Sequence, residues 1–190
     1  MKISKLAYSI LCLALTISSC DTAGDGARVD EDTASTRADE YATVTDANRD
    51  EDFVTDAIEA NAEELAWLNA GINRGTDAEL KSQARQMKSD HEQMDKELRD
   101  FASKKNISLG DIDADTNVNL TERAGNEWDE EWADEMADQH RRLIRRFERA
   151  DQKIQESELV GIIRKSLPTL RSHMDMAEKL EEKFDNMPDR

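Results

Sequence analysis

The sequence predicts an all-α protein in which a disordered N-terminal tether is followed by an up-down-up-down four-helix bundle. The 190 residues include 7 Gly and 2 Pro, too few for the many turns of a β-sandwich or barrel. Hydrophobic residues make up 37% of the chain and charged residues 36%, a balance typical of a helical domain with one buried face. After residue 50, apolar residues recur at alternating spacings of three and four, which is the period of a helix in a bundle.

Charge and cysteine content exclude several function classes. The formal net charge is −17, so a phosphate-coated partner is repelled at long range and nucleic-acid binding is excluded. The two cysteines, Cys12 and Cys20, both lie in the first twenty residues. The body of the chain therefore holds neither a disulfide framework nor a cysteine-based metal site.

The first residues have the features of a bacterial lipoprotein signal. Lys2 and Lys5 form a basic start, and residues 6–17 form an apolar stretch too short to span a bilayer. The stretch ends in Ile17-Ser18-Ser19-Cys20, which resembles a lipobox. The resemblance implies that residues 1–19 are removed and that Cys20 is lipidated; an ordinary secretory signal with a coincidental cysteine is the alternative. The acyl chains anchor the protein to a membrane.

Residues 20–49 are predicted to form a lipidated, acidic and flexible tether. They are rich in Asp, Glu, Thr, Ala, Ser and Gly, and their few apolar residues show no sustained period. Repulsion between the acidic groups extends such a tether and holds the domain away from an anionic membrane surface.

The remaining residues, 50–190, are predicted to form the bundle, with helices at about 50–73, 76–105, 126–155 and 157–186. The second helix has the clearest start, because Thr76-Asp77-Ala78-Glu79 matches a capping box with Thr76 as the N-cap. Short links join the first helix to the second and the third to the fourth, whereas the polar middle link is long. These links predict the up-down-up-down order.

Three histidines are the most informative feature of the sequence. The chain has only His91, His140 and His173, and each lies on the apolar stripe of a different predicted helix. Counting along the helices at 1.5 Å per residue places all three in one layer. Neutral imidazoles suit Zn, Cu, Ni or Fe(II), so the layer is a candidate metal site. Glu64 offers a fourth ligand by type, although the same count places it roughly 9 Å from the layer.

Other interpretations of the histidines stay open. Methionines lie three or four residues from each histidine, and a thioether beside an imidazole favours Cu(I), but such methionines also fill cores; they are Met87, Met136 and Met176. In a structural interpretation the imidazoles hydrogen-bond to Glu64, Asp90 or one another and set helix register. In a third, a hydrolase or oxidoreductase uses an open pocket at the layer.

A di-iron carboxylate enzyme is excluded by spacing. Such a site needs Glu-x-x-His on two helices, and the residues three before the histidines are Lys88, Ala137 and Leu170. The sequence also lacks a Gly-rich phosphate loop and a nucleophile elbow.

The assembled motifs resemble the ferritin-like domain-of-unknown-function family 4142, often labelled putative outer-membrane protein. The resemblance covers about residues 50–180. Its most specific pieces are Met87-Lys88-Ser89-Asp90-His91 and the segment from Leu167-Pro168 to His173; Phe53-Val54, Ala57, Glu64, Trp128-Asp129, Met136 and His140 also match. The resemblance implies an envelope-associated four-helix bundle and supplies no activity. With the lipobox, it predicts a lipid-anchored protein of the bacterial envelope, at the outer membrane, that binds a metal or a partner rather than turning over a substrate.

Overall fold

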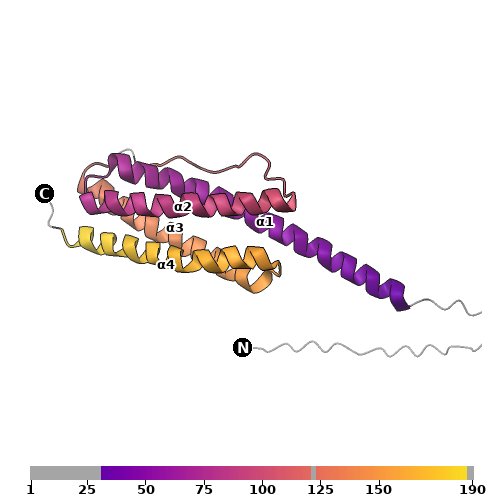
Figure 1. The fold of residues 1–190 in the computed structure, drawn as a ribbon. Coiled ribbons are helices and arrows are strands. Elements are labelled where there is room, and N and C mark those ends of the chain that lie inside the picture. Colours follow the sequence, from indigo (N-terminus) through magenta and orange to yellow (C-terminus); the bar gives the residue numbers. More distant parts are fainter. Residues whose placement is uncertain (1–30, 121–122, 188–190) are drawn as a thin grey trace, which may run out of the picture.

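The computed structural model describes residues 31–120 and 123–187, which form four helices and no strand (Figure 1). The helices are α1 (Glu31–Arg74), α2 (Ala78–Lys105), α3 (Asn126–Lys153) and α4 (Ser157–Asp185). The predicted all-α four-helix bundle is confirmed. The bounds of α2, α3 and α4, and the end of α1, lie within two residues of the predicted ones.

Helix α1 begins at Glu31, well before the predicted start near Asp50, so residues 31–49 are helical rather than irregular. This stretch contains no Gly or Pro, and it continues a helix that is already packed, which is easier than nucleating a new one. Arg49 also forms an ion pair with Asp46 one turn earlier, at 2.6 Å. The N-terminal part of α1 extends beyond the other helices (Figure 1). Residues 1–30, with the predicted signal and Cys20, lie outside the described residues.

The N-cap of α2 is Asp77 rather than the predicted Thr76. The Asp77 carboxylate accepts hydrogen bonds from the backbone N–H groups of Glu79 and Leu80, as an N-cap does. The Thr76 hydroxyl instead donates to Asp129 Oδ2 at 2.6 Å. Asp129 is fully buried in the first turn of α3, so the starts of α2 and α3 lie at the same end of the bundle.

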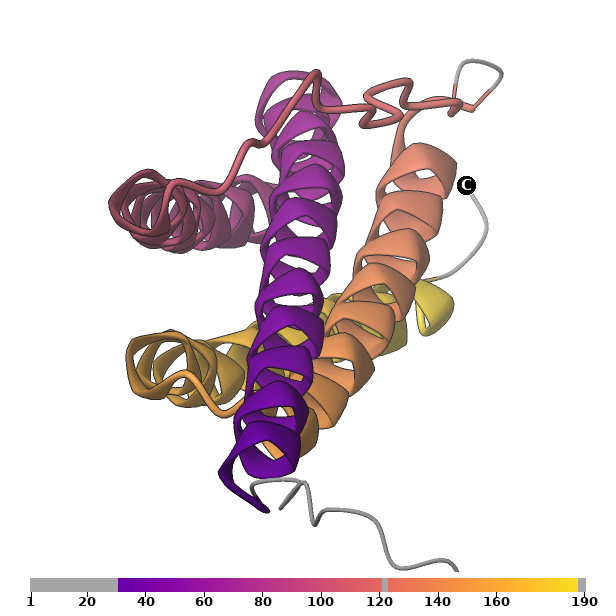
Figure 2. The ribbon, with the colours of Figure 1, turned by 90° about the vertical axis from the view of Figure 1, so that its right-hand side faces the viewer.

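The predicted up-down-up-down order is wrong, because α2 and α3 run parallel. At the opposite end, Lys105 at the end of α2 pairs with Glu156 before α4 at 2.9 Å. The link between α2 and α3 runs back along the outside of the bundle (Figures 1 and 2). It is tied to α1 where Arg74 donates to the Leu120 carbonyl at 2.8 Å. An extended chain covers roughly 3.3 Å per residue against 1.5 Å in a helix, so this link is long enough to return. The order is therefore up-down-down-up.

The core consists of two apolar clusters with a polar layer between them. One, the Phe147 cluster, gathers Phe53, Leu98, Phe147 and Ile163 with their neighbours. The other, the Trp132 cluster, gathers Leu68, Met87, Trp132 and Leu180 with theirs. The chain passes from the Phe147 to the Trp132 cluster along α1 and α4, and in the reverse sense along α2 and α3. Helices α2, α3 and α4 cross the polar layer near their middles, whereas α1 crosses it in its C-terminal third, at Asn61 and Glu64.

Candidate metal centre

The polar layer consists of five buried side chains, contributed by all four helices. Each is at most 3% exposed: Asn61, Glu64, His91, His140 and His173. In each helix the residues before the layer belong to one apolar cluster and those after it to the other. The three histidines that the sequence predicts to share a layer are therefore brought together.

The three imidazoles converge through one nitrogen each. His91 Nε2 lies 3.3 Å from His140 Nε2 and 3.4 Å from His173 Nδ1. One ligand atom from each ring can be chosen so that all three lie within 4.8 Å of one another. The ring centroids are 5.3–5.4 Å apart, so no ring is displaced from the group.

The other nitrogen of each ring has an acceptor that fixes its tautomer. His140 Nδ1 lies 2.8 Å from the carbonyl oxygen of Met136, and His173 Nε2 lies 2.9 Å from Asp90 Oδ2. His91 Nδ1 lies 2.8 Å from Asn61 Oδ1. The Asn61 amide is oriented by its own Nδ2, which donates to the backbone carbonyl of His91 at 3.2 Å. Carbonyl and carboxylate oxygens only accept, so these three outer nitrogens carry the protons.

The three converging nitrogens, called the inner nitrogens below, are His91 Nε2, His140 Nε2 and His173 Nδ1. They therefore present lone pairs to one another with no proton between them. Lone pairs at this distance repel unless a positive charge lies among them. Two nitrogens bound roughly 2.0–2.1 Å from a tetrahedral metal ion lie roughly 3.3–3.4 Å apart. The distances from His91 Nε2 to the other two nitrogens match that spacing.

Burial keeps the imidazoles neutral, which is the form that binds a metal. Desolvation lowers the pKa of His140 to about 4, against an opposing effect of the hydrogen bond to Met136. Desolvation and the neighbouring imidazoles hold the pKa of His91 well below its usual range. Desolvation also lowers the pKa of His173, although the Asp90 carboxylate acts in the opposite sense. Metal binding near neutral pH thus displaces no proton from these rings.

Glu64 lies in the layer rather than above it. Its Oε2 is 3.2 Å from His91 Nδ1 and its Oε1 is 3.7 Å from His140 Nδ1. Side chains tilt toward the N-terminus of their helix, so Glu64 on α1 and His91 on the antiparallel α2 lean toward each other. Glu64 faces the outer nitrogens of His91 and His140, away from the converging ones. Among the described residues neither carboxylate oxygen has a hydrogen-bond partner, and burial raises the pKa of Glu64 to about 8.

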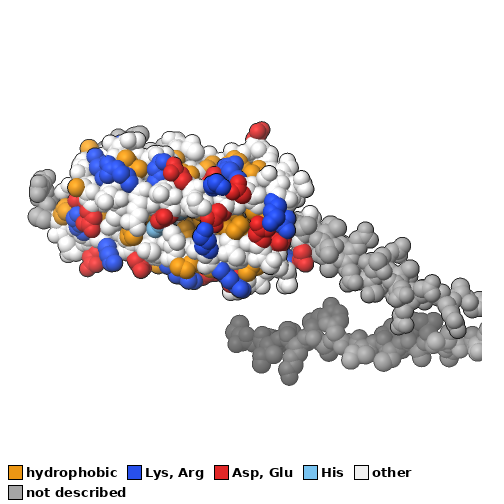
Figure 3. Space-filling view, viewed as in Figure 1, with side chains coloured by type: hydrophobic (Ala, Val, Ile, Leu, Met, Phe, Trp, Pro, Cys, Tyr) orange, Lys and Arg blue, Asp and Glu red, His pale blue; other side chains and the backbone are white. Residues whose placement is uncertain are grey.

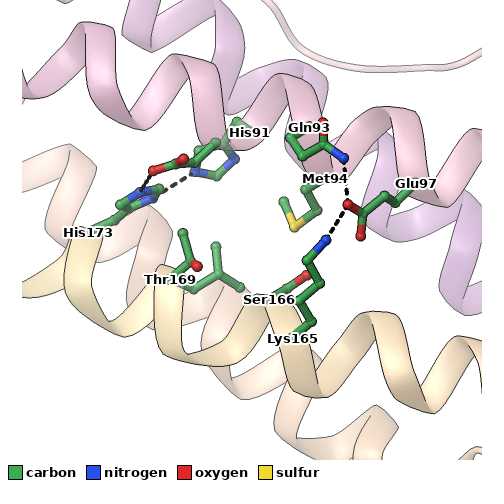
Figure 4. A pocket seen from close by; sticks show the side chains of 10 residues that line it. His91, Gln93, Met94, Glu97, Lys165, Ser166, Thr169 and His173 are labelled. Atoms are coloured by element: carbon green, nitrogen blue, oxygen red, sulfur yellow. Dashed lines mark hydrogen bonds and ion pairs between the residues drawn. The ribbon is translucent and has the colours of Figure 1, made fainter.

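Two cavities flank the layer on different sides. A cavity of about 140 Å³ opens between α2 and α4 and is lined by His91 and His173 (Figure 4). A second, of about 110 Å³, lies between α1 and α3 and is lined by Glu64, Gln139 and Arg142. In the space-filling view a small area of histidine is visible on the face that carries α2 and α4 (Figure 3).

Of the three outer partners of the histidines, the sequence predicted Asp90 but missed the Asn61 amide and the Met136 carbonyl. Asp90 directly precedes His91 in the sequence, but its carboxylate accepts a hydrogen bond from His173 on α4. The Met136 carbonyl is reached because His140 lies four residues further along the same helix. The thioethers of Met87 and Met136 belong to the Trp132 cluster, with Met176 packed against it, as core methionines do.

Fold and site together define an all-α four-helix bundle with a buried group of three histidines whose geometry suits a metal ion. The family described as domain of unknown function (DUF4142) matches residues 34–180, and the chain belongs to this family. Searches of curated proteins and of solved structures found no match. Within residues 31–120 and 123–187, no helix has the length and hydropathy of a membrane span.

Proposed function

We propose that this protein is a lipid-anchored module of the bacterial envelope that binds one transition-metal ion through His91, His140 and His173. The observation that carries the metal site is that one nitrogen of each ring lies beside an oxygen acceptor, which leaves the other nitrogen unprotonated and directed to the same point. Structural hydrogen bonding alone does not favour this arrangement, because none of the inner nitrogens has a proton to donate to another.

Imidazole donors select the class of metal. Three neutral nitrogens suit Zn²⁺, Cu²⁺, Ni²⁺ or Fe²⁺ and are poor ligands for Mg²⁺ and Ca²⁺, which prefer oxygen. The outer hydrogen bonds orient each ring and raise its basicity, as partners of metal-bound histidines do. Glu64 faces the outer side of two of these rings, so its role in the proposal is to orient them or to compensate charge.

A titration of purified protein, stripped with a chelator, tests the metal site. We expect about one equivalent of Zn²⁺, Cu²⁺ or Ni²⁺ to bind. Replacing any one histidine by Gln weakens binding by more than the roughly 10–100-fold typical of losing an outer partner. Met87→Leu is the matched control, because it changes a buried neighbour of the layer without removing a nitrogen. Equal affinity of the wild type and the variant with all three His→Gln changes contradicts the proposal.

One observation supports the alternative that the histidine layer only sets helix register. Asn61 on α1 bonds both the ring and the backbone of His91 on α2, which fixes the register of these two helices. If the layer only sets register, His140→Leu changes stability while added metal leaves the unfolding midpoint of the wild type unmoved. A metal-dependent rise of that midpoint, absent in His140→Leu, favours the metal site.

The envelope location rests on the sequence of the first twenty residues and on the family. Residues 6–17 and the Ile17-Ser18-Ser19-Cys20 motif support lipidation at Cys20. Mass spectrometry of the mature N-terminus, with Cys20→Ser as the comparison, tests the anchor. The expected result is a lipidated residue 20 in the wild type and loss of membrane association in the variant. An unmodified N-terminus at another residue rejects it.

A further inference from the structure

The cavity between α2 and α4 leads from the surface to two of the three histidines. The ion pair of Glu97 and Lys165, at 2.5 Å, lies at one end of this cavity, and His91 and His173 lie at the other (Figure 4). We propose that this cavity holds a small exogenous anion as the fourth ligand of the metal. The proposal rests on the metal site proposed above and extends it to a ligand that the protein does not supply.

The coordination set is incomplete without an added ligand. The group of candidate ligands within the described residues comprises the three histidines alone. The nearest carboxylate in the layer, that of Glu64, lies against the outer nitrogens of His91 and His140. A tetrahedral ion held by three protein ligands keeps its fourth position for water or an exogenous molecule.

The α2–α4 cavity is the route to that fourth position. His91 and His173 are each 1% exposed, yet both line this cavity. The α1–α3 cavity is lined by Glu64 and contains no histidine. Of the two cavities, only the one between α2 and α4 therefore reaches the metal-binding rings.

Charge favours an anion in this position. Three neutral imidazoles leave both positive charges of a divalent ion uncompensated, and the Asp90 carboxylate, which bonds His173 and also lines this cavity, offsets only one of them. An anion on the metal offsets the other. The Glu97 carboxylate does not repel it strongly, because the Lys165 ammonium and the Gln93 amide both donate to Glu97 Oε1.

Size and lining restrict the anion to a few heavy atoms. A cavity of about 140 Å³ holds several waters or one small ion, and no extended chain. Thr169 lines the cavity one helical turn before His173, and its hydroxyl is able to donate a hydrogen bond to an anion there. Met94 projects its thioether into the same space and adds an apolar wall (Figure 4).

Spectroscopy of the cobalt-loaded protein tests the proposal, with azide as the probe. One Co²⁺ replaces the native ion, and its visible bands report the fourth ligand. We expect azide to change these bands in a saturable way. Thr169→Leu, which fills the cavity, weakens the azide effect by at least about tenfold, whereas Thr169→Val, which keeps the shape of threonine and loses only its hydroxyl, weakens it by about threefold. Ala60→Leu, which fills the α1–α3 cavity instead, leaves the azide effect unchanged.

The outcomes separate this inference from the metal site itself. Failure to bind Co²⁺ rejects the metal site. Binding of one Co²⁺ whose spectrum does not respond to azide rejects the exogenous ligand and leaves the metal site standing. An equal response in wild type and Thr169→Leu rejects the cavity as the place of binding. If Thr169→Leu does not fold, Ser166→Val on the same wall replaces it.

Discussion

Asp90 on α2 accepts a hydrogen bond from His173 on α4, with 2.9 Å between Oδ2 and Nε2. The carboxylate side chain is 42% exposed and the imidazole 2%, so a solvated charge orients a buried ring across the seam between two helices. Because Nε2 carries the proton, Nδ1 of His173 is left free for the metal. A partly exposed carboxylate therefore sets which nitrogen of a buried imidazole is available to a metal ion.

Replacement of this carboxylate is expected to weaken metal binding without removing a ligand. Asp90→Asn removes the charge that raises the basicity of His173, and we expect a loss of roughly 10–100-fold in metal affinity. A competition titration against a chromophoric chelator measures it. Asp100→Asn, which changes an exposed acid on the same helix that pairs with Lys96, is the control and leaves the affinity unchanged. Equal affinities of Asp90→Asn and wild type count against the proposed role of Asp90.

The metal-free protein is expected to have opposite pH dependences from two residues in the layer. The pKa of His140 is about 4 in the folded protein, below its unfolded value of about 6.5. Because the unfolded chain binds the proton first, the free energy of unfolding decreases as pH falls from about 6.5 to 4. The pKa of Glu64 is about 8 when folded, above its unfolded value, so Glu64 removes stability as pH rises from about 4.5 to 8. Each effect is on the order of a few kcal/mol.

Urea unfolding at pH 5, 6.5 and 8 in the presence of a chelator measures both effects. Glu64→Gln is expected to gain stability relative to wild type at pH 8 and much less at pH 5. In His140→Gln the free energy of unfolding is expected to differ less between pH 6.5 and pH 5 than it does in wild type. Parallel stability curves for wild type and Glu64→Gln would show that the carboxyl group titrates near its ordinary pKa.

Two glycines are expected to respond oppositely to alanine. A Cβ on Gly71 lies 2.6 Å from the ring of Trp132, which is fully buried and donates to the Trp67 carbonyl at 2.8 Å. Gly71→Ala therefore destabilises the protein, by about 1–3 kcal/mol. A Cβ on Gly161 meets nothing within 4 Å, so Gly161→Ala stabilises α4 by about 0.5–1 kcal/mol. Thermal unfolding measures both, and shifts of the same sign contradict this account of Trp132 packing.

Asp129 is expected to be the most sensitive acid outside the histidine layer. Its carboxylate accepts from the backbone N–H groups of Thr76 and Asp77 and from the Thr76 hydroxyl. Asp129→Ala leaves these donors without their partner and costs about 3–5 kcal/mol. Asp134→Ala, an exposed acid on the same helix, costs less than about 0.5 kcal/mol. Denaturant unfolding compares them, and faster amide exchange at Thr76 and Asp77 is the specific sign of the lost contact.

Periodicity predicted the helices and the shared layer, but not the direction of each helix. The heights of His91, His140 and His173 agree in the structure even though α3 and α4 both run opposite to their predicted directions. Each histidine lies near the middle of its helix, and the middle stays at the same height when a helix is reversed. Reversal would have moved a residue near a helix end by the length of the bundle.

The connectivity could not be deduced from the length of the middle link alone. Residues 106–125 suffice either for a loose loop at one end or for a return along the bundle. The link carries apolar residues that pack on the core, with Ile107, Leu109 and Ile112 against the Phe147 cluster and Val118 and Leu120 with the Trp132 cluster. The early apolar residues of the link contact one cluster and the later ones the other, as expected of a link that returns along the bundle. In the sequence alone, these residues look like scattered apolar positions.

The outer partners of the histidines depend on helix rotation, which the sequence does not specify closely. Asp90 and His91 are adjacent and so point about 100° apart around α2, and the rotation of the helix decides whether the Asp90 carboxylate also reaches α4. Similarly, Asn61 orients His91 by bonding both its ring and its backbone carbonyl, and the spacing of residues along α1 does not indicate this role. The residue types at the centre were predictable, whereas the contacts that set their protonation required coordinates.

The parallel arrangement of α2 and α3 divides the chain into two helical hairpins, α1–α2 and α3–α4. One imidazole comes from the first hairpin and two come from the second. An ion bound by all three therefore acts as a cross-link between the halves. If the chain were cut within the link between α2 and α3, the two fragments would still share both apolar clusters, and bound metal would strengthen their association.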